Sequence, residues 1–280
     1  VHEPPAHTEI KFTPSASGSF RNPKETSLKM MQTTVGFVSI SVYENRWFAV
    51  DETGKLWAWG FNGSGLLGDG TKISPNYPIN IAEGVNFISV CAGGSWTYAI
   101  DQEGFLWAWG RNSAGQLGNG TNNECPVPKQ VPTDVRFVSV SKQSFAVDVD
   151  GGLWAWGSNQ FGRLADGTTE TQLSPVHILP DKKFTVASSD DGSTLALDKD
   201  GNIWSWGSNI YGQRGDGTGE EYLNPFKSTE NGGITAIGAT IANGRVFKID
   251  ENGKLLAIGE NNGRFGNGGT KSEIYFVPIN

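Results

Sequence analysis

Hydrophobic and polar positions alternate over short runs along most of the chain, and the same order of runs returns about every 50 residues. A period of two over four to eight residues predicts β-strands rather than helices. Each unit opens with such a run, which we expect to be its first strand. The five runs are FVSISV (37–42), FISVCA (87–92), FVSVS (137–141), FTVAS (184–188) and ITAIGA (234–239).

Three further strands are expected in each unit. A second apolar run ends in Asp and is followed by a turn with Gly at its end, as in DETG and DQEG, where Gly permits the positive φ of a hairpin. The third strand reads LWAWG or a variant of it. After a loop rich in Gly and Asn, a Pro-marked fourth strand such as Tyr77–Ile81 suits an edge position, because Pro cannot donate a ladder hydrogen bond.

The most regular part of the unit is GKLWAWGFNGSGLLGDGT at Gly54–Thr71, which recurs at 104–121, 151–168, 201–218 and, in worn form, 253–270. Four short strands repeated in series predict an all-β fold, a β-propeller of four-stranded blades. Five blades are favoured, and six or more are the alternative if the N-terminal residues are ordered. We expect residues 1–34 to be a tail that adds an edge strand, and 35–280 to be the propeller, with units near 35–84, 85–134, 135–183, 184–233 and 234–280.

The third strand is apolar on both of its faces, which suits a sheet that lies between two neighbouring sheets. Its second tryptophan recurs at Trp59, Trp109, Trp156 and Trp206. These side chains could stack on sugars or bases. We favour packing of blade against blade, because large aromatic side chains dominate protein cores, and we expect all four to be buried.

Composition excludes several classes of function. The formal net charge is −7 and no stretch collects Lys and Arg, so nucleic acid is not an expected partner. No apolar run approaches the roughly 18 residues that cross a bilayer, so membrane insertion is not expected. Cys91 and Cys125 lack a CxxC spacing and are expected to be buried or half-buried thiols, and the three histidines are scattered. We therefore expect no metal, no cofactor and no enzymatic activity.

The chain begins with Val1 rather than Met, so we expect the native N-terminus to have been trimmed, and any signal peptide with it. The compartment stays open, with a secreted or cell-surface location favoured over a cytoplasmic one.

The hairpins between the second and third strands gather acidic residues at one end of the propeller. Two interpretations are open: a negative field that steers a basic partner, or, as favoured here, Asp side chains that cap the turns. The residues are Asp51, Glu52, Asp101, Glu103, Asp148, Asp150, Asp198, Asp200, Asp250 and Glu251.

The string W-G-x-N-x-x-G-Q-L-G-x-G-T, complete at Trp109–Thr121, resembles the repeat of the regulator of chromosome condensation family, and the resemblance runs from about Phe37 to Ile279. It implies a propeller, usually of seven blades. Its founding eukaryotic member is an exchange factor for a small GTPase and binds chromatin, and other members inhibit β-lactamases or serve as interaction modules. The family often has His at the start of the second strand, where this chain has Arg46, Trp96, Gln143, Ser193 and Arg245. Because only five repeats are visible and no basic tail is present, we do not expect exchange-factor activity or chromatin binding in this chain.

The loop between the first and second strands is the only part of the unit that varies in length, and its sequence also diverges. Diverging loops on a rigid scaffold are where recognition normally lies, although neutral drift explains them equally well. We expect a non-enzymatic, protein-binding module that uses this rim, with a carbohydrate-binding propeller as the alternative. The expected binding residues, which include those of the adjoining loop after W-G, are Tyr43, Arg46, Trp96, Lys142, Asp190, Arg245, Phe161 and Tyr211.

Overall fold

A computed structural model describes residues 36–189, 193–209, 218, 222–227, 236–239, 246–250, 252–259, 261–262 and 265–279. Within these ranges the chain forms β-strands and one short 3-10 helix, η1 (Gln160–Gly162), and no α-helix. Contacts divide the chain into Val1–Thr34 and Val35–Asn280. The first of these units lies outside the described residues, so the extra edge strand expected there stays a prediction.

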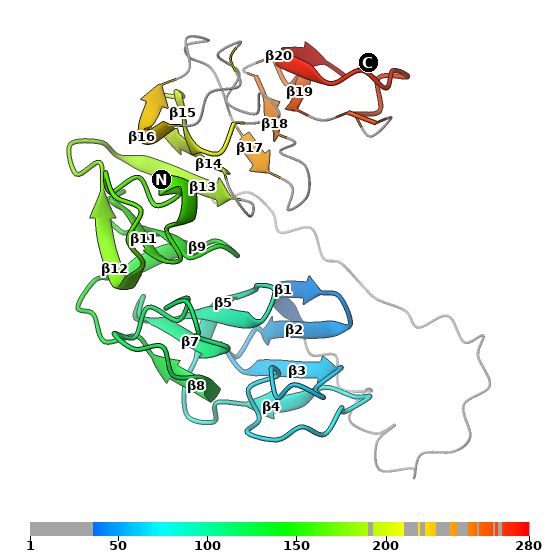
Figure 1. The fold of residues 1–280 in the computed structure, drawn as a ribbon. Helices are drawn as coiled ribbons and strands as arrows, with labels where there is room; N and C mark the ends of the chain where they lie inside the picture. The colour runs from blue at the N-terminus through cyan, green and yellow to red at the C-terminus, as the bar shows by residue number, and fades with distance from the viewer. Residues whose placement is uncertain are drawn as a thin grey trace, which may run out of the picture. The chain divides into compact units, whose positions relative to one another are not determined.

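The strands form five antiparallel sheets, each made of four strands that are consecutive in the sequence, and the sheets follow one another in chain order (Figure 1). We call them blades 1 to 5. This arrangement confirms the all-β propeller fold with four-stranded blades. The strands are β1 (Phe37–Tyr43), β2 (Arg46–Asp51), β3 (Leu56–Gly60) and β4 (Ile79–Ile81) in blade 1; β5 (Phe87–Ala92), β6 (Trp96–Asp101), β7 (Leu106–Gly110) and β8 (Cys125–Gln130) in blade 2; β9 (Phe137–Val140), β10 (Phe145–Asp148), β11 (Leu153–Gly157) and β12 (Gln172–Ile178) in blade 3; β13 (Phe184–Ser189), β14 (Ser193–Asp198), β15 (Ile203–Gly207) and β16 (Tyr222–Lys227) in blade 4; and β17 (Ala236–Ala239), β18 (Val246–Ile249), β19 (Leu255–Gly259) and β20 (Glu273–Pro278) in blade 5.

The fourth strand of each blade is an edge strand, as its prolines predicted. It pairs only with the third strand of its own blade. Pro126 and Pro128 lie in β8, Pro175 in β12 and Pro225 in β16. An edge position tolerates Pro because its outer side has no ladder partner.

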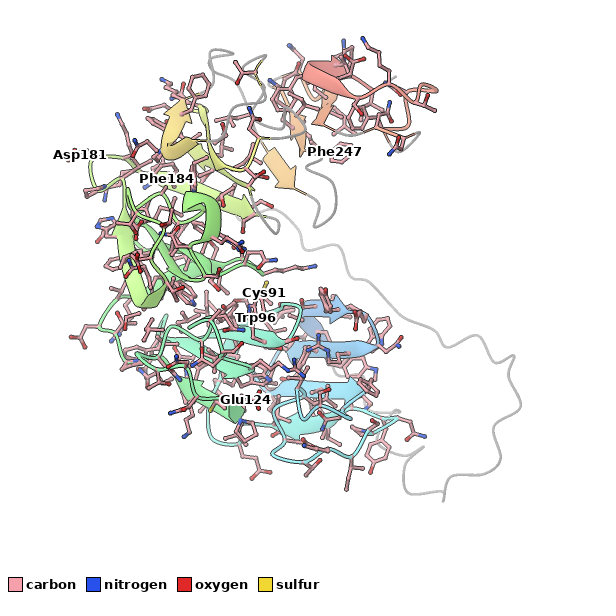
Figure 2. The ribbon with its side chains drawn as sticks, in the orientation of Figure 1. Cys91, Trp96, Glu124, Asp181, Phe184 and Phe247 are labelled. Carbon is pink, nitrogen blue, oxygen red and sulfur yellow. The ribbon has the colours of Figure 1, made fainter. Side chains whose placement is uncertain are left out.

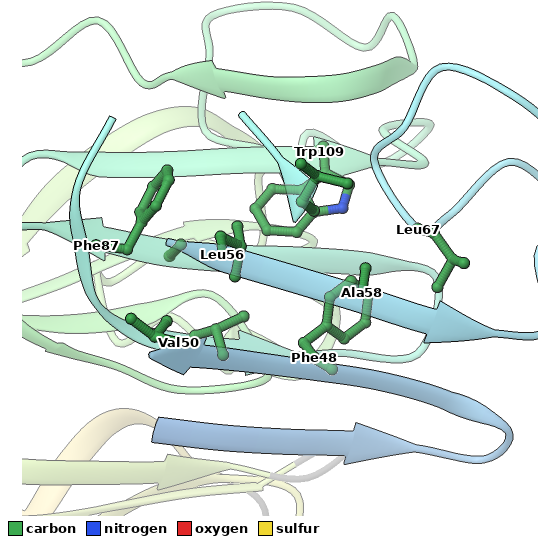
Figure 3. Close-up of a cluster of buried hydrophobic side chains, with 11 residues drawn as sticks. Phe48, Val50, Leu56, Ala58, Leu67, Phe87 and Trp109 are labelled. Carbon is green, nitrogen blue, oxygen red and sulfur yellow. The ribbon is translucent and has the colours of Figure 1, made fainter. Parts of the chain in front are cut away.

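The hydrophobic core lies between successive blades. Figure 3 shows one such joint, in which Phe48, Val50 and Leu56 of blade 1 face Phe87 and Trp109 of blade 2. Corresponding clusters join blade 2 to 3, blade 3 to 4 and blade 4 to 5. Each inner sheet is therefore covered on both faces, which is why its third strand is apolar on both sides.

The second tryptophan of the third strand makes the joint between blades in three of four cases. Trp109, Trp156 and Trp206 are buried and lie against Phe48, Tyr98 and Phe145 of the preceding blade, at ring-centroid distances of 5.9, 5.5 and 6.0 Å. The expectation of burial is confirmed for these three.

The same expectation is wrong for Trp59, which is only half-buried. Its ring stacks on Trp47 of its own blade, with centroids 6.0 Å apart and an interplanar angle of 13°. The physical reason is that no described blade packs against this face of blade 1.

A buried asparagine shapes the loop that follows each W-G pair. In blade 1, Asn62 Nδ2 donates to Asp69 Oδ1 (2.9 Å) and to the Thr71 carbonyl (3.1 Å), while Asn62 Oδ1 accepts from Leu67 N (3.0 Å). Asn112 and Asn159 make the same bonds in blades 2 and 3. These three bonds fix the spacing from Asn62 to the tetrapeptide Gly68–Thr71 (GDGT) and hold it as a tight turn.

Within the same loop, a glycine packs against the tryptophan of the next blade. A Cβ at Gly68, whose φ is +89°, would lie 2.7 Å from Trp109 Nε1. A Cβ at Gly118 would lie 3.0 Å from the ring of Trp156. Glycine is required because the tryptophan of the following blade occupies the space of a side chain.

Candidate functional site

The loops between first and second strands lie at the same end of a blade as the loops that follow W-G. Phe61 N donates to the Asn45 carbonyl and Arg111 N donates to the Ser95 carbonyl, both at 2.8 Å. We call residues 43–46, 93–96 and 141–144, from blades 1 to 3, the loop rim. It contains four of the eight residues expected to bind a partner.

Arg46 is buried in the loop rim rather than exposed at its surface. It is 3% exposed, and its Nη2 donates to the Gly93 carbonyl (3.2 Å) and to the Gly94 carbonyl of blade 2. Its guanidinium carbon lies 5.3 Å from the centroid of the Tyr43 ring, and Nη1 has no hydrogen-bond partner. Burial lowers the pKa of Arg46, and nearby Glu44 and Tyr43 oppose this in part. The side chain therefore ties the first loop of blade 1 to that of blade 2.

Trp96 makes the next connection along the loop rim (labelled in Figure 2). It is half-buried, and its Nε1 donates to the Lys142 carbonyl of blade 3 at 2.9 Å. A Cβ at Gly93 would lie 2.7 Å from that same nitrogen, so Gly93 leaves room for the indole. The first residue of the second strand thus links blade 1 to blade 2 through Arg46 and blade 2 to blade 3 through Trp96.

Of the four expected binding residues in the loop rim, Tyr43 and Lys142 make none of these hydrogen bonds with their side chains. Both are half-buried, and Lys142 joins the network through its backbone carbonyl rather than its ammonium group. Lys142 also lies near Cys91, where burial raises the pKa of the thiol to about 11 and the lysine charge lowers it in part. Cys91 is half-buried, Cys125 is buried and both are free thiols, as expected.

The other four expected binding residues lie wholly or in part outside the described residues. Asp190, Tyr211 and Arg245 lie outside the described residues. Phe161 lies in η1 of blade 3, on the loop after W-G, and its side chain is outside the described part of the chain. A binding role for all eight residues stays a prediction.

The acidic hairpins at the opposite end use their aspartates internally. Asp51 Oδ1 accepts from Thr53 N (2.8 Å) and Lys55 N (3.0 Å), and Asp51 Oδ2 accepts from Trp57 Nε1 at 2.8 Å. The bond from tryptophan to aspartate recurs at 2.8 Å in three more blades, in the pairs Asp101 with Trp107, Asp148 with Trp154 and Asp198 with Trp204. The turn-capping interpretation is therefore confirmed for Asp51, Asp101, Asp148 and Asp198.

The hydrogen bonds also set the charge of the hairpin. Burial alone would raise the pKa of Asp198, but bonds from Trp204, Asn202 and the backbone outweigh it and lower the pKa. Asp51 behaves in the same way, with Thr53 and Trp57 as the main donors. The carboxylates are held ionised, and their oxygens are occupied by the hairpin itself.

One buried polar cluster was not predicted from the sequence. The Tyr98 hydroxyl donates to the Gln116 carbonyl and lies 2.6 Å from Ser144 Oγ, and Trp156 Nε1 donates to the same carbonyl at 2.9 Å. Burial raises the pKa of Tyr98, and its bonds to Ser144 and Trp156 oppose this in part. The cluster joins blades 2 and 3 directly beneath the loop rim. Nothing in the repeat pattern marks it, because Tyr98 occupies a position that is Phe or Leu in other units.

The described residues contain no group of three or more His, Cys, Asp or Glu placed to hold a metal ion. None of the helices in the described part of the chain is long and apolar enough to cross a membrane. A shallow cavity of about 280 Å³ beside β3 is lined by Lys55, Trp57 and the turn at 82–86, away from the loop rim.

The repeat units of this chain match a known protein family. The Regulator of chromosome condensation (RCC1) repeat matches residues 53–100, 103–142 and 150–197, and a second description of the same repeat matches 184–213. These segments cover more than half of the sequence, so the chain belongs to the RCC1 repeat family. Among curated proteins, none matches the sequence.

Solved structures share the fold at low sequence identity. Human WBSCR16 is 19% identical with a TM-score of 0.75, over 88% of this chain and 67% of that protein. Prp20p from Saccharomyces cerevisiae is 20% identical with a TM-score of 0.77, over 92% of this chain and 66% of that protein. Yeast RCC1 (Prp20) bound to Kap60 is 18% identical with a TM-score of 0.74, over 91% and 63%. The chain therefore spans about two thirds of the length of these proteins.

The preference for a secreted or cell-surface location is wrong. It rested on the absence of Met at the first position, which says nothing about the compartment. The structure of Prp20p was described with its binding to Gsp1p and histones, and histones are proteins of the cell interior.

Proposed function

We propose that this chain is a non-enzymatic, protein-binding propeller whose partner contacts the loop rim. The observation that carries the proposal is the chain of contacts from Arg46 to blade 2 and from Trp96 to blade 3. These contacts hold loops of divergent sequence on a scaffold of constant length. Such preorganisation lowers the entropy that binding must overcome.

Two rim residues are suited to contact a partner. Tyr43 offers an aromatic ring, and Lys142 offers a positive charge on a chain of net charge −7. Tyrosine is a frequent energetic anchor of protein interfaces. A lysine at the rim contributes charge complementarity toward an acidic partner surface. Arg46 and Trp96 would act as positioning residues, because Arg46 Nη2 and Trp96 Nε1 donate hydrogen bonds to the next blade.

The similar structures support protein binding as the class of function. Prp20p was described with its binding to Gsp1p and histones, and yeast RCC1 was solved with Kap60 bound. The carbohydrate-binding alternative has no such support. The tryptophans that could have stacked on sugars at positions 109, 156 and 206 are buried between blades.

Affinity purification with quantitative mass spectrometry tests the proposal. The wild-type protein, a rim variant (Tyr43→Ala with Lys142→Glu) and a hairpin variant (Glu103→Lys with Asp150→Lys) serve as baits at equal concentration. Glu103 and Asp150 are exposed at the opposite end, so the hairpin variant is a matched surface control. We expect the specific partner to be lost from the rim variant by more than about tenfold and kept by the hairpin variant.

The opposite result, with loss in the hairpin variant and retention in the rim variant, contradicts the proposal and places the partner at the acidic end. Circular dichroism of each bait checks that the fold is kept. A glycan array with the same three proteins tests the carbohydrate alternative. Sugar binding by the wild type that is lost in the rim variant would show that the loop rim binds a carbohydrate and not a protein.

A further inference from the structure

Two departures from the repeat meet at the joint between blades 2 and 3. The interval from the first-strand Phe to the hairpin Asp is 11 positions in blade 3 (Phe137 to Asp148) and 14 in blades 1, 2 and 4, so the loop between the first two strands of blade 3 is the shorter one. Tyr98, on the second strand of blade 2, stands where the other units have Phe or Leu. Its hydroxyl lies 2.6 Å from Ser144 Oγ, at the end of the shorter loop.

The backbone of this loop is strained at Ser144. Its φ is +63°, in the left-handed region that residues other than glycine rarely adopt, and its side chain is 4% exposed. Glu44 in blade 1 also has a positive φ, but it is exposed in an ordinary two-residue turn. Ser141 Oγ, in the same loop as Ser144, is buried and has no hydrogen-bond partner among the described residues. Such features persist only where the surrounding structure imposes them, and they are concentrated at functional sites.

Two side chains of β6 hold the loop in this conformation. Trp96 and Tyr98 are two positions apart on the strand, so they project from the same face of the sheet, toward blade 3. Trp96 Nε1 donates to the Lys142 carbonyl at 2.9 Å, and the Tyr98 hydroxyl is hydrogen-bonded to Ser144 Oγ two residues further along. Blade 2 therefore fixes the loop both at Lys142 and after it.

We propose that Tyr98 and Ser144 are positioning residues of the loop rim: their hydrogen bond holds residues 141–144 in the strained conformation, and that conformation presents the Lys142 side chain to the partner. The inference rests on the proposed function, because it takes the loop rim as the surface that the partner contacts. Neutral divergence of the loop gives no reason for a serine where glycine adopts the same φ without strain. It also gives no reason for a tyrosine hydroxyl at a position that is Phe in three other units.

Tyr98→Phe and Ser144→Ala test the proposal, because each removes one hydroxyl of the bond and keeps most of the side chain. Hydrogen exchange at the backbone amides of 141–145 should become faster in both variants. Affinity purification with quantitative mass spectrometry should recover about fivefold less of the specific partner with either variant than with the wild type. The double variant should lose no more than the single variants, since both act through one bond.

Trp154→Phe is the matched control. It removes one hydrogen bond, from Trp154 Nε1 to Asp148 Oδ2 at 2.8 Å, at the hairpin end of the same blade. We expect it to lower the melting temperature while the exchange of 141–145 and the recovery of the partner stay at the wild-type level. The control thus separates loss of the rim conformation from loss of stability.

Unchanged exchange at 141–145 in Tyr98→Phe overturns the proposal, and so does full recovery of the partner by both variants. If the rim variant (Tyr43→Ala with Lys142→Glu) loses the partner in that second case, the proposed function stands and only the positioning role fails. Equal losses of the partner in Trp154→Phe, or additive losses in the double variant, also overturn the proposal. A wild type that captures no specific partner contradicts the proposed function and this inference together.

Discussion

The same substitution at two repeat-equivalent tryptophans should have very different costs. Trp156 is 1% exposed, meets Tyr98 edge-on at 5.5 Å and donates to the Gln116 carbonyl at 2.9 Å. Trp156→Ala removes this burial and leaves a cavity between blades 2 and 3, which typically costs 3–5 kcal/mol. The Gln116 carbonyl keeps its bond from the Tyr98 hydroxyl, so little is added for an unsatisfied acceptor. We expect a loss of about 4 kcal/mol in the free energy of unfolding.

Trp59→Ala removes a half-buried ring that stacks only on Trp47. Its expected cost is about 1 kcal/mol in dilute solution, in the range of ordinary single substitutions. Urea unfolding followed by far-UV circular dichroism measures both values. Equal losses of unfolding free energy in the two variants would refute the claim that a tryptophan at this position stabilises the fold by packing against the preceding blade.

Three other expectations follow from the hairpins and the thiol. Trp204→Phe removes the donor to Asp198 and should cost about 2 kcal/mol in urea unfolding, the usual value for a bond to a charged group; an unchanged midpoint would argue against it. Asp51, Asp166 and Asp198 have lowered pKa values, so the unfolded chain takes up protons first as the pH falls below about 4. Their contribution to stability is therefore complete above that pH and lost below it, and melting temperatures that stay level down to pH 2 would be inconsistent with this. Cys91, with a pKa of about 11, should react with iodoacetamide at pH 7 far more slowly than a solvent-exposed cysteine, and rapid labelling of the folded protein would contradict its burial.

The fold was predictable because every unit repeats the same local signals. Alternation with a period of two gave the strands, and the paired apolar faces of LWAWG indicated a sheet covered on both sides. β17 is described from Ala236, and the first two positions of the expected strand, 234 and 235, lie outside the described residues. Trp59 was misjudged because its sequence context equals that of Trp109, while its burial depends on a neighbouring blade.

The candidate site was less predictable, because its chemistry depends on contacts between units. Arg46 was expected to bind a partner at the rim, but its Nη2 donates to carbonyl groups of blade 2, which no pattern within one unit reveals. The bond between aspartate and tryptophan in the hairpins had a signal that was available. Asp51 and Trp57 lie six residues apart, this spacing recurs in four units, and the tryptophan is replaced by Leu256 in the fifth.

Site-specific photo-crosslinking tests the protein-binding account most directly. A photoreactive phenylalanine analogue is placed at Tyr43 in the loop rim or at Glu52, an exposed residue of the acidic hairpin in the same blade. Both proteins are irradiated in cells of the native source, and adducts are identified by mass spectrometry. We expect a specific protein adduct from position 43 and none from position 52. Adducts from position 52 alone, or none from position 43 while the folded protein is present, would contradict the central claim.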